Sequence, residues 1–154
     1  MNIDFRKIMS NLIYNTLLKM PGGYYTDEAH KMVFRTGMAE TKYKTIKQYN
    51  GGPAIGFFQI EPDTLNDTMK NYVKYRPSLL DCLKKLGLNE DDMEYSVLTN
   101  IALQIAFCRI HYRRNPYKIP GTLEEQGKYW KEHYNTKLGK GTVRHFIESN
   151  TNEQ

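Results

Sequence analysis

Apolar residues recur every three to four positions along most of the chain, which is the period of an α-helix. The first such segment spans 3–19 and ends where Pro-Gly-Gly occupies positions 21–23. Thr26 is a typical helix N-cap, and Asp27 places negative charge in the first turn, where the helix dipole favours it. A second helix is therefore predicted over 26–43.

Five further segments continue the helical pattern. Pro62 suits the first turn of one helix, and Thr122 with Glu125 forms a candidate capping box before another. The segment 93–114 is apolar over so much of its surface that we expect it to be the central, buried helix. The five predicted helices are 62–75, 77–86, 93–114, 123–134 and 142–149.

The segment 44–60 departs from the helical period. Its sequence TIKQYNGGPAIGFFQI, from position 45, has an Asn-Gly turn between two short stretches that favour β-structure, which predicts a small hairpin or three-stranded ribbon. A chain of 154 residues is long enough for one domain with a core. We therefore expect a single mainly α (α+β) domain over 1–154, with about seven helices, one small β-hairpin and a polar tail from about 149.

Composition narrows the class of protein. The apolar share of 40% and the charged share of 25% are typical of a globular chain. No apolar run is long enough to span a bilayer, and Asp4, Arg6 and Lys7 interrupt the N-terminal segment, so we expect neither membrane insertion nor a signal peptide. We expect a monomer.

The two cysteines, Cys82 and Cys108, have apolar neighbours and are predicted to be small buried residues of a reduced protein. No His/Cys cluster has the spacing of metal ligands, so neither a metal nor another cofactor is expected.

The net charge of +5 and the pI of about 9.1 favour polyanionic partners in general. The densest basic run is Arg109, His111, Arg113 and Arg114, near the end of a predicted helix, where cations suit the dipole. We interpret it as a solvated helix end. The rival interpretation is a nucleic-acid surface, but no recognition helix or RNA-binding motif accompanies the run, so no nucleic-acid partner is expected.

Glu40 lies near the end of the second predicted helix, between apolar positions and beside the small residues Gly37 and Ala39. A carboxyl next to apolar surroundings has its charged form disfavoured, so its pKa rises. Such a carboxyl can hold a proton near neutral pH and donate it to a glycosidic oxygen. Taken alone, a solvated helix glutamate beside Lys42 and Lys44 is the commoner arrangement.

The residues around Glu40 add a family resemblance. The chain carries Glu40-Thr41 and then GFFQIEPDT at 56–64. This resembles the lysozyme-like superfamily, in particular its phage lytic transglycosylase and goose-type lysozyme branch. In that branch a helix ends in Glu followed by Ser or Thr, and a β-element has the form Gly-x-x-Gln-[Ile/Val/Met]-x-Pro-x-Thr. A third element, a Tyr-Asn pair followed by glycines, is matched by Tyr134-Asn135, or its tyrosine by Tyr112.

The resemblance implies a cleft that binds alternating N-acetylglucosamine and N-acetylmuramic acid. Glu40 would be the general acid/base, and Gln59 would bond a sugar N-acetyl group or Glu40 itself. Gly56 would let a sugar approach the backbone closely. The substrate-binding residues would be Gln59, Gly56, Phe57, Tyr134 and Asn135, with Tyr49, Phe58 and Trp130 as further aromatic candidates. Aromatic residues at these spacings are more often core residues.

The reaction outcome depends on a second carboxylate. An inverting hydrolase needs a base roughly 6.5–9.5 Å from the acid, and Glu61 is the candidate. A lytic transglycosylase needs none, because the muramic 6-hydroxyl attacks C1. Glu61 is equally suited to the start of the helix at Pro62. A peptidoglycan muramidase with one essential carboxylate is predicted; a hydrolase and a non-catalytic cell-wall or virion protein are the alternatives.

The resemblance extends to small phage proteins. It implies synthesis in the host cytoplasm and action on the cell wall, in the periplasm or from the virion. Delivery partners would then be a holin or other virion proteins.

Overall fold

The computed structural model describes residues 3–136 and 139–151. The prediction of a mainly helical protein is confirmed. The α-helices in the described ranges are α1 (Ile3–Lys19), α2 (Asp27–Glu40), α3 (Pro62–Asn71), α4 (Pro77–Leu86), α5 (Met93–Leu98), α6 (Ile101–Arg113), α7 (Leu123–Trp130) and α8 (Val143–Thr151). Short turns of other helix types are the 3₁₀ helices η1 (Tyr49–Gly51), η2 (Val73–Tyr75) and η3 (Glu90–Asp92) and the π-helical turn η4 (Lys131–Asn135).

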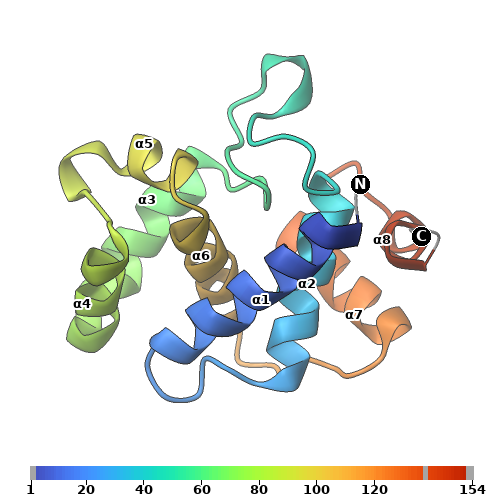
Figure 1. Cartoon of the computed structure of the whole chain (residues 1–154), viewed down its shortest axis with the longest axis horizontal. Helices are drawn as coiled ribbons and strands as arrows, with labels where there is room; N and C mark the ends of the chain where they lie inside the picture. Colours follow the sequence, from blue (N-terminus) through green and yellow to red (C-terminus); the bar gives the residue numbers. More distant parts are fainter. Residues whose placement is uncertain (1–2, 137–138, 152–154) are drawn as a thin grey trace.

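Helix α6 is the centre of the fold and contacts α1, α2, α3, α4 and α5. In Figure 1, α3, α4 and α5 lie to the left of α6, while α7 and α8 lie to the right, with α1 and α2 between. Every α6 residue from Leu103 to Ile110 is buried, because α6 is apolar almost all round. The prediction of a central buried helix is confirmed for this segment.

The predicted helix over 93–114 is not continuous. It breaks between α5 and α6, where the Asn100 side chain caps α6 by accepting a hydrogen bond from the Leu103 N–H at 3.0 Å. The Asn100 amide also donates to the Leu86 carbonyl at 2.8 Å. A short polar side chain that bonds nearby backbone competes with helix continuation, so the break follows from Asn100.

The second helix ends at Glu40 rather than at residue 43. Lys42 and Tyr43 take left-handed backbone conformations, with φ of 55° and 57°. Tyr43 packs over Gly37 so closely that a Cβ there would lie 2.2 Å from its ring, so the tyrosine occupies the space beside Gly37. Glu40 is therefore the last helical residue of α2.

The predicted β-hairpin is wrong as a strand structure. Within the described part of 44–60, pairing is limited to two isolated antiparallel bridges, Lys47 with Ile55 and Ile55 with Ile60. Gly56 (φ 79°) and Gln59 (φ 52°) adopt left-handed conformations that interrupt extended backbone. The segment is a folded loop, at the top of Figure 1, that closes over the end of α2.

The basic run near the end of α6 is a solvated helix end only at Arg113, which is exposed. Arg109 is only 4% exposed, and its Nε donates to the Tyr24 carbonyl at 2.7 Å. His111 donates to the His133 carbonyl, and Arg114 pairs with Asp67 at 2.8 Å. These side chains point to different neighbours because successive residues of a helix face different directions.

Both cysteines are free thiols, but only Cys108 is fully buried, whereas Cys82 is partly exposed. Within residues 3–136 and 139–151, no helix combines the length and apolar character needed to cross a membrane.

Candidate functional site

Glu40 is partly buried at the C-terminal end of α2, and its carboxyl contacts the indole of Trp130. Trp130 is 1% exposed, and its Nε1 donates to Glu40 Oε2 at 2.9 Å. Burial raises the pKa of Glu40 to about 7, and the Trp130 hydrogen bond only partly opposes that rise. Near neutral pH this carboxyl is therefore present in both its protonated and its ionised form.

Glu40 opens onto a cleft of about 690 Å³. Its walls are formed by the ends of α2, α6 and α7, the 44–60 loop, the start of α3, η4, and the segment that leads into α8 together with the first turn of α8. The lining residues are Ala39, Glu40, Gln48, Ala54, Gln59, Glu61, Thr64, His111, Trp130, Tyr134, Asn135, Thr136, Gly139, Lys140, Gly141 and His145.

The cleft gathers six of the residues singled out in the sequence: Glu40, Gln59, Glu61, Trp130, Tyr134 and Asn135. They come from three parts of the chain, at residue 40, at 59–61 and at 130–135, so the fold is what brings these parts together. A smaller hollow of about 60 Å³ shares Gln59, Glu61 and Tyr134 and extends the cleft toward Leu65 and Phe107.

Gly56 and Phe57 do not line the cleft. A Cβ at Gly56 would lie 2.8 Å from Cδ of Gln104, so the space beside this glycine is filled by a side chain of α6. Phe57 is 8% exposed and packs edge-on against Phe5 and Tyr43. Phe58 is fully buried, and the side chain of Tyr49 lies outside the described residues.

Gln59 stands on the cleft wall and also holds its own turn. Its Nε2 donates to the Gly56 carbonyl at 2.9 Å, while its backbone adopts a left-handed conformation. Gln59 is therefore both a cleft residue and a structural amide that bonds within its own turn.

Tyr134 and Asn135 belong to the π-helical turn that directly follows α7. The Tyr134 hydroxyl donates to the Phe58 carbonyl at 2.6 Å, which ties this turn to the 44–60 loop across the cleft. Lys131 donates to Asn135 Oδ1 at 2.8 Å and to the Gly139 carbonyl at 2.9 Å. Tyr112, the alternative tyrosine, is buried behind Tyr134 at a ring distance of 5.2 Å and does not line the cleft.

Two buried polar residues hold the loop in place: Thr41, which the sequence singled out only as part of the Glu-Thr motif, and Gln104, which it did not single out. Thr41 Oγ1 donates to the Phe57 carbonyl at 2.8 Å. Gln104 Oε1 accepts from the Phe57 N–H at 2.9 Å, and its amide donates to the Val97 carbonyl at 3.0 Å. The amide of Gln104 among the otherwise apolar residues 101–108 was the available signal, since buried polar groups are normally bonded.

Histidines form another part of the cleft that was not foreseen. His145 Nε2 donates to the Ala39 carbonyl at 2.7 Å, next to Glu40 in the chain. Burial holds the pKa of His111 below its usual range, which favours a neutral imidazole.

Glu61 is the other carboxylate among the described cleft residues. It is exposed and occupies the N-cap position of α3, yet its side chain makes no capping bond. The carboxylate is thus free of the capping role that the sequence offered for it.

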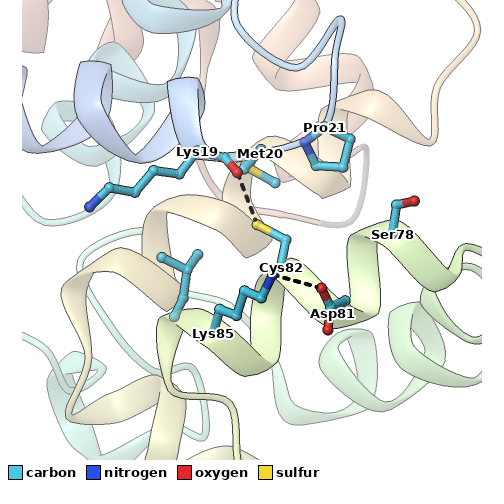
Figure 2. A pocket seen from close by; sticks show the side chains of 8 residues that line it. Lys19, Met20, Pro21, Ser78, Asp81, Cys82 and Lys85 are labelled. Atoms are coloured by element: carbon cyan, nitrogen blue, oxygen red, sulfur yellow. Dashed lines mark hydrogen bonds and ion pairs between the residues drawn. The ribbon is translucent and has the colours of Figure 1, made fainter.

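A separate cavity of about 610 Å³ lies between the end of α1 and helix α4 (Figure 2). There, Cys82 Sγ donates to the Lys19 carbonyl at 3.4 Å, and Lys85 pairs with Asp81 at 3.1 Å. The carboxylate of Asp81 is already paired with Lys85 and is about two-thirds exposed. This cavity therefore lacks a buried carboxyl that could donate a proton as Glu40 can. We therefore take the Glu40 cleft as the candidate functional site.

Among residues 3–136 and 139–151, no group of three or more His, Cys, Asp or Glu side chains is placed to hold a metal ion. No family model, curated protein or solved structure matches the chain.

Trp130→Phe tests whether the indole N–H stabilises the ionised carboxylate. Hydrogen bonds to charged groups contribute about 1.5–3 kcal/mol, so the pKa of Glu40 should rise further, by about one pH unit or more. A carbon-13 NMR titration of the side-chain carboxyls measures this without any substrate, and the signal lost in Glu40→Gln identifies Glu40. An unchanged or lowered pKa would show that the indole does not act on the carboxylate.

Proposed function

We propose that this protein cleaves peptidoglycan glycan strands at the β-1,4 bond between N-acetylmuramic acid and N-acetylglucosamine, with Glu40 as general acid and base. One observation carries the proposal: a partly buried carboxyl whose pKa is about 7 opens onto a cleft. A general acid is most effective when its pKa lies near the working pH. The Glu-Thr and Gln-x-x-Pro-x-Thr pattern of this segment supports the same reaction class.

The transglycosylase reaction uses one carboxyl group twice, first as a general acid and then as a general base. Protonated Glu40 gives its proton to the glycosidic oxygen as the bond between that oxygen and muramic C1 breaks. The muramic 6-hydroxyl oxygen then bonds to C1 and passes its proton to the Glu40 carboxylate, which restores the acid. Gln59, Tyr134 and Asn135 line the cleft and are the proposed sugar-binding residues.

An inverting hydrolase is the second candidate, and the position of Glu61 favours it. Its exposed carboxylate lies on the cleft wall without a capping bond, so it is available to activate a water molecule. In that reaction water bonds to C1, Glu61 takes the water proton, and a reducing muramic end is formed.

Mass spectrometry of the soluble products from purified peptidoglycan separates these reactions. Anhydromuramic ends that are absent with Glu40→Gln would establish the transglycosylase. Reducing muramic ends would establish the hydrolase. Retention on peptidoglycan without products from either protein would overturn the catalytic proposal in favour of a cell-wall binding role.

Glu61→Gln should leave the rate of peptidoglycan cleavage within about twofold of the wild type if Glu40 is the one essential carboxylate. The amide keeps the size of the side chain but cannot accept a proton from water. Turbidity loss of a peptidoglycan suspension measures the rate. A fall of about a hundredfold or more, with reducing ends in the residual product, would instead assign Glu61 as the base.

The proposal includes a phage origin, with action on the cell wall in the periplasm or from the virion and delivery by a holin or virion proteins. This part depends on the motif resemblance. A nucleic-acid partner is not proposed, because Arg109, His111 and Arg114 contact the protein itself rather than forming one basic surface.

A further inference from the structure

Two arginines of α6, Arg109 and Arg113, have no carboxylate partner in the described parts of the chain, where ion pairs within 4.0 Å involve other residues. Arg109 is buried, and the groups that accept its hydrogen bonds are carbonyls of Tyr24 and Gly23. Carbonyl oxygens carry only partial charge, so they do not neutralise a guanidinium. A buried cation without a counter-ion is costly, which makes this arrangement unusual for a purely structural site.

The neighbouring guanidinium adds to that cost. Arg109 and Arg113 are four residues apart on one helix face, where like charges repel. Burial, and next the charge of Arg113, lower the pKa of Arg109. Both guanidiniums lie near the ring of Tyr24, at 5.6 Å and 5.3 Å from its centre. The ring of Tyr24 therefore contacts both guanidinium groups, and its carbonyl accepts a hydrogen bond from Arg109.

The two arginines line a cavity of about 280 Å³ that shares no residue with the Glu40 cleft. Gly23 and the start of α2 form one side, and the segment after α6 forms the other.

We propose that this cavity binds a phosphate group, either as the free ion or as the phosphate of a monoester. Three cations, Arg109, Arg113 and Lys118, face one carboxylate, Glu28, so the lining carries a net charge of +2, which a dianionic phosphate balances. Guanidinium groups present a planar fork of N–H donors that matches phosphate oxygens. Tyr117 also lines the cavity and provides an aromatic face for the organic part of the ester. The proposal is independent of the chemistry at Glu40.

Isothermal titration calorimetry at low ionic strength tests the site with the whole chain and three probes: inorganic phosphate, glucose 1-phosphate and acetate. The wild type should bind both phosphates saturably and one-to-one, and acetate at least about tenfold more weakly, because it carries half the charge. Tighter binding of glucose 1-phosphate than of inorganic phosphate would identify a phosphorylated small molecule as the ligand. Equal binding would identify the free ion.

Arg113→Gln is the decisive variant, because Arg113 is exposed and its loss should not unfold the protein. It should weaken phosphate binding by about tenfold or more, the usual effect of losing a charged hydrogen-bonding partner. Lys74→Gln removes the same charge from an exposed residue outside the cavity and should leave the affinity unchanged. Absence of saturable binding, or an equal loss in both variants, would overturn the proposal, since the second result means diffuse attraction by net charge.

Discussion

Glu40→Gln should lower the turnover of peptidoglycan cleavage by about a thousandfold, within the roughly 10²–10⁴ that a positioned general acid contributes. The amide has the shape of the carboxyl, and its oxygen can still accept the Trp130 N–H bond, so the cleft should keep its geometry. What the variant loses is the transferable proton. The measurement is the release of soluble muropeptides from purified peptidoglycan at about pH 6.

Glu94→Gln is a matched control, because Glu94 is an exposed residue of α5 that does not line the cleft. It makes the same change of charge and should retain full turnover. The Glu40 variant should still sediment with peptidoglycan, since the other cleft residues are intact. If Glu40→Gln kept more than about a tenth of the wild-type turnover, its assignment as the general acid would be wrong.

The helices could be predicted because the segments in which apolar residues recur with the helical period contain the helices of the structure. Thr26 caps α2 and Thr122 caps α7 by accepting N–H bonds from Ala29 and Glu125, as their positions in the sequence indicated. The breaks were less predictable. Asn100 ends one helical pattern in favour of a cap, although the apolar residues on both sides keep the same period. Periodicity reports which face is buried and does not report where backbone hydrogen bonding is interrupted.

The candidate site was predictable where a short motif carries the chemistry. Glu40 was singled out from the Glu40-Thr41 motif and Gln59 and Glu61 from 56–64, and the fold brings all three to one cleft. The hairpin prediction failed because left-handed conformations at Gly56 and Gln59 depend on contacts made elsewhere in the fold. Gln104, forty-five residues after Gln59, supplies one of those contacts at Phe57. No pattern within 44–60 could have revealed it.

The same burial that suits Glu40 for proton transfer makes its ionised form costly to the fold. A carboxyl whose pKa rises on folding binds its proton more tightly in the folded state, so stability falls as pH rises from about 4.5 to about 7 and then levels off. At about 1.36 kcal/mol for each pKa unit, the loss approaches about 3 kcal/mol above pH 7. Below pH 4 the carboxyl is protonated in both states and imposes no such cost.

Glu40→Gln should therefore be more stable than the wild type at about pH 8 and equally stable at about pH 4. For a chain of this length, about 3 kcal/mol corresponds to a rise in Tm on the order of 6–12 °C. Thermal unfolding followed by circular dichroism at both pH values measures the difference, with Glu94→Gln expected to show none. A Glu40 variant that melts below the wild type at about pH 8 would mean that the ionised carboxylate stabilises the fold. Because this test needs no substrate, it separates the burial of Glu40 from its proposed reaction: a raised Tm beside unchanged turnover would leave a buried acid without a catalytic role.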